Sequence, residues 1–439
     1  MHGRKKIPRN VIVLGLVSLF TDVSSEMIYP LVPVFVTALG SGAIVLGVIE
    51  GVAETTASVL KLFSGILSDK IGKRKLLVVI GYSLSSLIRP FTGTVTAAWQ
   101  IVFVRMVDRV GKGIRTAPRD ALIASSVDQN MRGRAFGFHR AMDHTGAVLG
   151  PLIAVGTLVL LVGYLHITDT LLTLRWTFIL AVIPGGMAVT TAILFVREMT
   201  ADRTAQPAFR FSFKQFERTF TRYVLIVVLF TLGNSSDAFL LFRVEEAISE
   251  SRALYSLVTN MPVLGTMVNA FGDSQTQKQV VDILFLPLLW AFFHIIKVVF
   301  STPLGSLSDR IGRKTVICAG WGIYAFVYLS FAFLDRLPGS WQIVGTFLLF
   351  AIYALYYAFT EGAEKAFVAD VVGTQSRGSA FGLYNFAVGI GALPASIIFG
   401  FLYTTFGATA AFGTGAAIAC LSILLLAVFV PERSSNSSA

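Results

Sequence analysis

The stretch GILSDKIGKRK at residues 65–75 returns as GSLSDRIGRKT at residues 305–315, 240 positions later. Two shorter stretches repeat in the same order: RGRAFG at 132–137 returns as RGSAFG at 377–382, and SSE at 24–26 returns as SSD at 235–237. The chain therefore consists of two related halves. The last pair is only 211 positions apart, which predicts about 29 extra residues in the second half, at roughly 247–280.

The composition excludes an ordinary soluble enzyme. Of the 439 residues, 54% are hydrophobic and only 14% are charged, whereas a soluble domain carries about 25% charged residues. A bilayer core about 30 Å thick is crossed by roughly 20 apolar residues, so the chain has room for twelve membrane helices. We expect them at 10–38, 43–67, 76–96, 98–122, 135–163, 174–196, 222–245, 281–304, 315–335, 341–369, 379–404 and 409–430.

The basic residues predict the orientation of these helices. With both termini in the cytosol, 24 of the 36 Lys and Arg residues fall at cytosolic positions and only Arg252, Lys278 and Arg336 fall outside. Such a bias is the positive-inside pattern of inner-membrane proteins. The net charge of +11 is not gathered on one soluble face, so we expect no nucleic-acid partner.

The second half of the chain begins after a polar, basic stretch. Residues 197–221 form the expected cytosolic linker between an N-terminal six-helix bundle (1–196) and a C-terminal one (222–439), with the external insertion at about 247–280. Parallel repeats of six helices are a transporter architecture with a binding site near the membrane midplane.

These repeats resemble those of the major facilitator superfamily, and the resemblance covers essentially the whole chain. The loop signature G-x-x-x-D-[RK]-x-G-[RK]-[RK] of that family is matched by Gly65, Asp69, Lys70, Gly72, Lys73 and Arg74, and again by Gly305, Asp309, Arg310, Gly312, Arg313 and Lys314. The segments TDVSSEMIYP, DRVGKGIRTAPRD and TEGAEKAFVAD are similar to those of bacterial drug and metabolite transporters. The resemblance implies an all-α membrane protein with twelve transmembrane helices in two six-helix pseudo-repeats.

The repeated loop motif predicts a cytosolic gate, because its aspartates can cap helix ends or accept hydrogen bonds from Arg. In the family such a contact is associated with the outward-open state, although a plain positive-inside turn would also explain the motif. The expected gate residues, which include charged residues near the cytosolic ends of other helices, are Gly65, Asp69, Arg74, Arg115, Arg119, Gly305, Asp309, Arg313, Glu361 and Glu364.

The fifth helix carries Gly146-x-x-x-Gly150-Pro151, which partly matches the antiporter signature of the family. Small residues four positions apart let two helices approach closely. The motif therefore predicts a helix-packing site, and it favours exchange transport only weakly, because Ala154 and Val155 stand where that signature has glycines.

The fourth helix carries charged residues that project within an arc of roughly 140°. An ionised side chain at the bilayer centre costs roughly 2.5–3.5 kcal/mol, so this arc must face water or charged partners rather than lipid. In the family resembled, helices 1, 4, 7 and 10 line the central cavity. The expected substrate-cavity residues are Arg105, Asp108, Arg109 and Lys112 with Tyr29.

Three carboxyl groups lie deep in their helices. Asp22 and Glu26 are one turn apart, and Asp237 repeats Glu26 in the second half. A buried carboxyl group favours its neutral form, so these residues could carry coupling protons. Alternatively, Asp22 and Glu26 are permanently ionised partners of Arg105 or Arg109. His139 and His144 could titrate or serve as structural hydrogen-bonding residues.

The sequence thus predicts a secondary active transporter that moves a small organic solute by alternating access, coupled to protons and exporting a drug or metabolite by antiport. Two alternatives remain: an organic-anion carrier or importer that uses the basic stripe of the fourth helix, and a non-transporting receptor or assembly partner. The chain has no phosphate-binding loop, nucleophile elbow or metal-spaced cluster, so we expect no enzyme activity, cofactor or metal. The expected partners are the lipid bilayer, a small-molecule substrate and protons, and we expect a monomer.

Overall fold

A computed structural model describes residues 7–71, 73–127, 132–167, 169–199, 217–248, 252–262, 264–269, 274–372 and 377–431. These residues form helices and connecting turns, without a strand among them. The first half contains α1 (Arg9–Glu26), η1 (Tyr29–Leu31), α2 (Val32–Ala38), α3 (Ala43–Ile71), α4 (Arg74–Ile88), η2 (Arg89–Thr94), α5 (Ala98–Ser125), α6 (Arg132–Val159), the π-helix η4 (Leu160–Tyr164), α7 (Thr170–Leu180) and α8 (Val182–Phe195).

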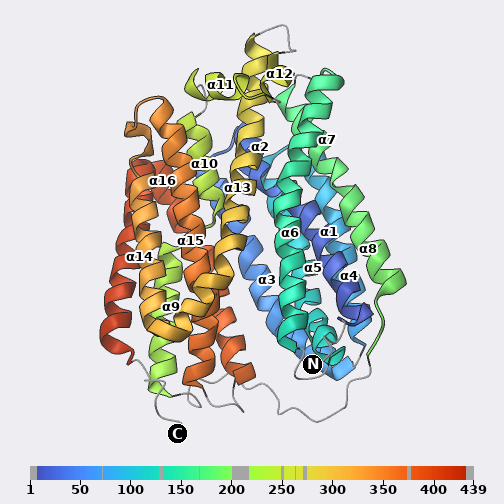
Figure 1. The fold of residues 1–439 in the computed structure, drawn as a ribbon, viewed down its shortest axis with the longest axis vertical. Coiled ribbons are helices and arrows are strands. Elements are labelled where there is room, and N and C mark those ends of the chain that lie inside the picture. The colour runs from blue at the N-terminus through green and yellow to red at the C-terminus, as the bar shows by residue number, and fades with distance from the viewer. Residues whose placement is uncertain are drawn as a thin grey trace, which may run out of the picture. The chain divides into compact units, whose positions relative to one another are not determined.

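The second half contains the three longest described helices, together with several short ones. It contains α9 (Arg218–Gly233), α10 (Ala238–Ile248), α11 (Arg252–Thr259), α12 (Leu264–Asn269), α13 (Ser274–Ile311), α14 (Arg313–Phe331), η6 (Leu334–Arg336), α15 (Ser340–Val371) and α16 (Arg377–Phe429). The short helices α11 and α12 occupy the predicted insertion. Figure 1 labels the α-helices along the chain.

Ten helices in the described residues are long and apolar enough to cross a membrane. Helix α5 is not among them because of its many charges, and residues 380–429 of α16 are counted once although Gly407 interrupts them with φ 83° and ψ 173°. Helix α16 has 53 residues, which at about 1.5 Å per residue exceeds the bilayer core more than twofold. The all-α membrane fold is therefore confirmed, and the count of twelve crossings stays a prediction.

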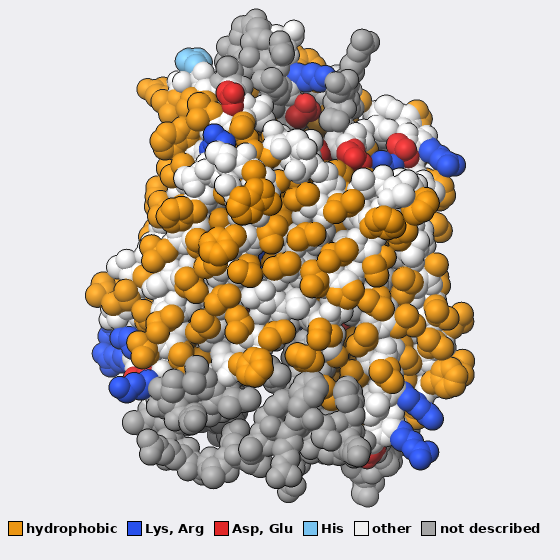
Figure 2. Space-filling model, turned by 180° about the vertical axis from the view of Figure 1, so that it is seen from behind, with side chains coloured by type: hydrophobic (Ala, Val, Ile, Leu, Met, Phe, Trp, Pro, Cys, Tyr) orange, Lys and Arg blue, Asp and Glu red, His pale blue; other side chains and the backbone are white. Residues whose placement is uncertain are grey.

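The outward side chains suit a lipid environment. On the face that Figure 2 shows, hydrophobic side chains cover the middle of the surface and the Lys, Arg, Asp and Glu side chains lie toward its two ends. Apolar surface between polar ends is what a bilayer requires of a protein that spans it.

Two compact units can be distinguished by the proximity of Cα atoms. Unit 1 comprises 1–41, 52–207 and 258–291, and unit 2 comprises 42–51, 208–257 and 292–439. In unit 1, α1 packs against α6 and α8, while α4 packs against α5 (Figure 1). In unit 2, α9 packs against α16, and α14 packs against α15 and α16. The predicted domain boundaries at 196 and 222 stay a prediction.

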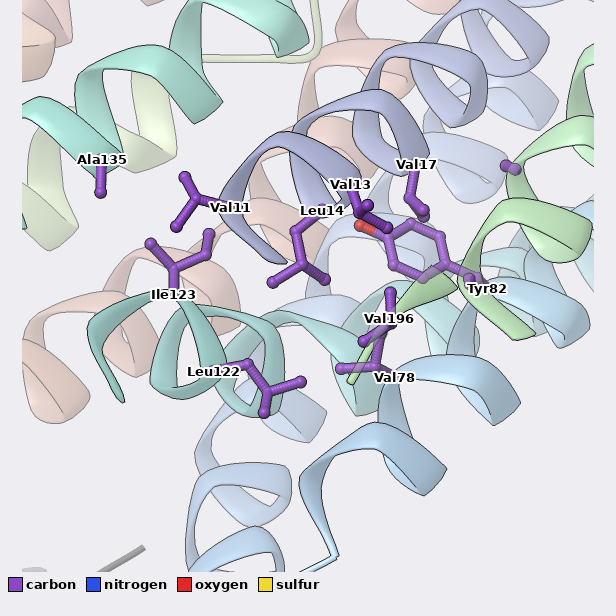
Figure 3. Packing of buried hydrophobic residues seen from close by; sticks show 12 residues of the cluster. Val11, Val13, Leu14, Val17, Val78, Tyr82, Leu122, Ile123, Ala135 and Val196 are labelled. Carbon is purple, nitrogen blue, oxygen red and sulfur yellow. The ribbon is translucent and has the colours of Figure 1, made fainter. Parts of the chain in front are cut away.

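One buried cluster joins five helices of unit 1. The cluster includes Val11, Val13 and Val17 of α1, and Figure 3 shows Val13 and Val17 pointing toward the ring of Tyr82 of α4, whereas Val11 points toward Ala135 and Ile123. The cluster also includes residues of α5, α6 and α8: Leu122, Ile123, Ala135, Ala188 and Ala192. The core therefore fixes which face of α1 and of α4 is turned inward.

Helices α4 and α5 approach each other most closely at a pair of glycines. A Cβ atom added at Gly111 would lie 2.5 Å from the Gly81 carbonyl oxygen, and one added at Gly81 would lie 2.6 Å from the Gly111 carbonyl oxygen. No side chain larger than hydrogen fits between the two backbones, so this contact sets the spacing of α4 and α5.

We expect Gly111→Ala to lower the free energy of unfolding by about 1–3 kcal/mol, because the added methyl group forces the two backbones apart. The measurement is thermal unfolding of the purified protein in detergent. Gly156→Ala is the control, because an added Cβ there has no neighbour within 4 Å. Equal unfolding temperatures for the two variants would contradict the expectation.

Candidate functional site

The charged face of α5 is turned into the protein. Arg105, Asp108 and Arg115 are at most 6% exposed. Trp99 and Phe103 on the same helix are 69% and 57% exposed. The arc of charges therefore meets protein groups rather than lipid, as the helical periodicity predicts.

Asp108 forms a deeply buried ion pair in unit 1. Its Oδ1 lies 2.9 Å from the Nε of Arg89 at the start of η2, and both side chains are at most 6% exposed. Arg89 also donates to the Thr21 carbonyl oxygen at 2.9 Å. The pair therefore ties α5, η2 and α1 together, and a role of Asp108 in substrate binding stays a prediction.

The other basic residues of α5 have different surroundings. Arg109 pairs with Glu54 of α3 at 3.4 Å. The Arg105 guanidinium lies over the ring of Tyr29 at 5.5 Å from its centroid, and the charges that act on Lys112 include Arg109, Glu54 and Asp22. The predicted cavity residues are therefore neighbours within unit 1, and their role in substrate binding stays a prediction.

Glycines of α6 bring that helix against the two acidic residues of α1. A Cβ atom at Gly146 would lie 2.9 Å from the Asp22 Cβ, and one at Gly150 would lie 2.6 Å from the Glu26 Cβ. The motif predicted for helix packing, which continues into Pro151, thus lies at the close approach of α1 and α6. Both carboxyl groups are consequently held at the α1–α6 contact.

Glu26 stands where the α-helical hydrogen bonding of its membrane segment gives way to a short 3-10 turn with helical backbone angles. Helix α1 ends at Glu26, and a short 3-10 helix with Pro30 follows. The carboxylate accepts a hydrogen bond from the Trp290 indole Nε1 at 2.8 Å, and Trp290 also contacts the Tyr29 ring with centroids 5.2 Å apart. The described hydrogen bond of Glu26 is therefore with a neutral donor.

Asp237 has a related setting in unit 2. Residues 234–237 separate α9 from α10, so the acidic residue stands at a break in its membrane segment. Asp237 accepts hydrogen bonds from the hydroxyl groups of Tyr353 at 2.6 Å and Tyr357 at 2.9 Å. The repeated SSE and SSD motifs thus place a carboxylate with neutral donors where each α-helix is interrupted.

Tyr357, which donates to Asp237, also makes a cation–π contact with Lys297. The Lys297 ammonium lies 4.2 Å from the Tyr357 ring centroid and 3.2 Å from Glu361 Oε1. Ring face and carboxylate together satisfy a Lys side chain that is 11% exposed. Lys297 therefore links Glu361 to the Asp237 site within unit 2.

The expected gate residues are only partly described. The side chains of Gly65, Asp69, Gly305 and Asp309 lie outside the described residues. The others have partners within their own unit. Arg74 donates to Ser125 Oγ at 2.8 Å, and Arg115 donates to Ser85 Oγ at 2.8 Å and lies over the Tyr82 ring. Arg119 pairs with Asp120 at 2.9 Å, Arg313 pairs with Asp370 at 3.3 Å, and Glu364 accepts hydrogen bonds from Trp321 at 2.9 Å and Tyr384 at 2.5 Å. Gating by these residues stays a prediction.

Sequence reasoning missed several partners of these charges. Trp290 and Tyr353 carry no signal in the sequence, because aromatic residues are common in membrane helices. Glu54 and Lys297 could have been suspected, because each is an ionisable residue inside an apolar run. Their pairing with Arg109 and Glu361 depends on how helices distant in sequence pack.

The family model of the Major Facilitator Superfamily matches residues 14–244 and 251–439. This chain belongs to the major facilitator superfamily. Members of the superfamily are transporters, and the protein is accordingly a multi-pass membrane protein that carries out secondary transport of a small molecule.

Curated relatives within the superfamily support the assignment. The chain is 33% identical to an uncharacterized MFS-type transporter of Methanocaldococcus jannaschii, over 96% of this chain and 95% of the relative. It is 27% identical to an uncharacterized protein of Mycobacterium tuberculosis, over 90% and 87%. A multidrug resistance protein of Photorhabdus laumondii is 30% identical, but only over 29% of this chain and 32% of its own length.

Solved structures show the same fold. The nucleoside transporter NupG has a TM-score of 0.66 at 15% identity and covers 95% of this chain and 97% of its own. A POT family transporter in complex with 5-aminolevulinic acid has a TM-score of 0.67 at 13% identity, with coverage of 97% and 96%. A D-xylose-proton symporter has a TM-score of 0.66 at 16% identity, with coverage of 96% and 97%.

We expect Asp108→Leu to lower the free energy of unfolding by about 3–5 kcal/mol, because the change leaves Arg89 as an uncompensated buried charge. The double variant Arg89→Met with Asp108→Leu should lose less than the single one. Unfolding in denaturant measures both. Asp120→Asn on the same helix is the control. Asp120 pairs with Arg119, and the Asp120 side chain is 44% exposed. Ion pairs exposed to solvent contribute about 0–1 kcal/mol. A double variant less stable than Asp108→Leu would refute the structural role of the pair.

Proposed function

We propose that this protein exports a small organic solute in exchange for protons, and that Asp22, Glu26 and Asp237 carry the coupling protons. The observation that supports this proposal best is the repeated carboxylate where an α-helix is interrupted. In each repeat that carboxylate accepts hydrogen bonds from neutral donors, Trp290 for Glu26 and Tyr353 with Tyr357 for Asp237.

Neutral partners suit a group that gains and loses a proton. If a carboxylate paired with Arg is protonated, a buried cation is left without its partner, which is costly. If a carboxylate held by Trp or Tyr is protonated, no unpaired charge remains. The described hydrogen bonds of Glu26 and Asp237 are of the second kind, and cations such as Lys112 and Lys297 act on these carboxylates without a described ion pair. Asp108 and Glu54, by contrast, pair directly with Arg. The division favours Glu26 and Asp237 over Asp108 as proton carriers.

Interrupted α-helices support the same assignment. Irregular backbone at membrane depth is tolerated only where it is buried in protein or lines a water-filled cavity. Discontinuous helices in transporters typically form the substrate and ion sites near the midplane. The interruption of α-helical hydrogen bonding after Glu26 and the break before Asp237 are therefore suitable places for groups that exchange protons with both sides in turn.

The direction of transport is inferred from a relative, from a glycine motif and from the basic residues. Part of the chain is similar to a multidrug resistance protein, and the glycine motif of α6 partly matches an antiporter signature. The bias of basic residues favours the inner membrane with both termini in the cytosol. We therefore propose export from the cytosol.

A panel of transport assays tests the proposal. The protein is reconstituted into liposomes, a pH gradient is imposed in either direction, and movement of uridine, D-xylose, 5-aminolevulinic acid and ethidium is followed. These compounds represent the solutes named for the structural neighbours and a typical multidrug cation. Transport that is indifferent to the pH gradient would refute proton coupling.

We expect Asp22→Asn, Glu26→Gln and Asp237→Asn each to lower transport driven by the pH gradient by about tenfold or more, since the amides cannot carry a proton. Exchange of labelled for unlabelled solute without a gradient should continue. Asp169→Asn is the control, because Asp169 caps α7 through the Leu172 amide and Asn caps equally well. Loss of exchange together with driven transport would indicate a binding role instead.

An organic-anion carrier is the second candidate. Five basic residues lie in or beside the α5 site, at positions 89, 105, 109, 112 and 115, and guanidinium groups suit carboxylate and phosphate. In that case Lys112→Gln should raise the KM for an anionic panel compound such as benzoate and leave that for ethidium unchanged. A KM for benzoate that does not change would speak against the anion carrier.

A further inference from the structure

His139 and Asp143 form a buried pair on α6 that the transport mechanism above does not use. His139 Nδ1 lies 3.6 Å from Asp143 Oδ2, and the two side chains are 5% and 17% exposed. Among the described residues, His139 Nε2 and Asp143 Oδ1 have no hydrogen-bond partner although both atoms are buried. Buried polar atoms without a partner require an explanation, and a role in proton transfer is one of them.

The pair lies between one end of α6 and Asp22. His139 is seven residues, about two turns, from the start of α6 at Arg132. Asp143 follows one turn deeper, and Gly146, three residues further on the same face, contacts Asp22. His139, Asp143 and Asp22 therefore stand at successive depths, from the end that the basic residues predict to be cytosolic toward the membrane interior.

Charged groups of α5, α1 and α6 itself lie near the pair and its neighbour Asp22. His139 is influenced by Arg119 and Asp120 of α5 and by Asp143 and Arg140 of its own helix. The groups that act on Asp22 are Asp143 of α6, Glu26 of α1, and Lys112 and Arg115 of α5. Asp143 is thus close enough to Asp22 for the two carboxyl groups to interact.

We propose that His139 and Asp143 relay protons between the cytosolic side and Asp22, an inference that rests on the proposed role of Asp22 as a proton carrier. A proton binds His139 Nε2, and the proton on Nδ1 passes to Asp143 Oδ2. The Asp143 carboxyl group then gives one proton to the Asp22 carboxylate. One proton enters and one leaves, and the imidazole returns to its first tautomer before the next transfer.

The geometry suits such a relay. An Nδ1 to Oδ2 distance of 3.6 Å is too long for a hydrogen bond, but a small side-chain rotation brings the atoms together, and proton-transferring pairs are often long in unliganded structures. Imidazole can take a proton on one nitrogen and release a proton from the other. Such a group can therefore pass protons between water and a carboxyl group inside the membrane.

The test measures protonation of Asp22 itself and needs no solute. The full-length protein in phosphatidylcholine liposomes receives a rapid drop in pH, and infrared spectroscopy follows the band of the protonated carboxyl group. Asp22→Asn identifies the band by removing it. We expect His139→Gln and Asp143→Asn to slow the appearance of the band roughly tenfold or more, and we expect His139→Gln to leave its final size unchanged.

His144→Gln is the matched control. It changes a second histidine of α6, which lies five residues after His139 and about 140° around the helix, and it should leave the rate within about twofold of the wild-type rate. Two different relay variants keep the test decisive if one of them fails to fold.

Each outcome separates the relay from the proposed function. An Asp22 band that forms at the wild-type rate in both His139→Gln and Asp143→Asn overturns the relay and leaves Asp22 as a proton carrier. In His139→Gln, a band whose final size falls together with its rate shows a merely structural role and also overturns the relay. Absence of an Asp22 band in the wild-type protein overturns both the relay and the proposed function of Asp22.

Discussion

The cost of placing a charge in hydrocarbon governs the arrangement of unit 1. Helix α5 carries ionisable residues along one face, and each must find a partner inside the protein or remain near water. The Arg89–Asp108 pair meets this requirement deep in the unit and also reaches the α1 backbone at Thr21. Once this pair is formed, the rotation of α5 is fixed, and Trp99 and Phe103 are left for the lipid.

A second constraint comes from the backbone. A break in a membrane helix frees amide and carbonyl groups that water cannot reach, so nearby side chains must satisfy them. Around the break before Asp237, the Tyr324 hydroxyl donates to the Gly233 carbonyl oxygen at 2.8 Å, and the Ser235 side chain forms a hydrogen bond with the Tyr328 hydroxyl at 2.8 Å. The tyrosines that support the break belong to the same aromatic group that holds the carboxylate. The same group of tyrosines therefore supports both the Asp237 carboxylate and the irregular backbone beside it.

Close helix packing connects these two constraints. The glycines of α6 let α1 approach within backbone contact, and the carboxyl groups of Asp22 and Glu26 are carried into that contact. A helix with larger side chains at positions 146 and 150 would hold α1 further away. Asp143 and His139 lie on the same side of α6, so the packing motif also decides which titratable groups become neighbours of Asp22.

The class of fold, the two related halves and the identity of the charged residues in the membrane could be predicted from the sequence alone. These follow from apolar run length, from the repeat at 65–75 and 305–315, and from the cost of buried charge, all of which act locally along the chain. The packing of α6 through Gly146 and Gly150 could also be anticipated, because small residues four apart are legible in one helix. The partners of these charges became known only from the fold: Asp108 forms an ion pair with Arg89, Glu26 accepts a hydrogen bond from Trp290, and Asp237 accepts hydrogen bonds from two tyrosines. Each of these pairs joins residues from different helices, and periodicity gives the face on which a side chain lies but not the neighbour that it meets.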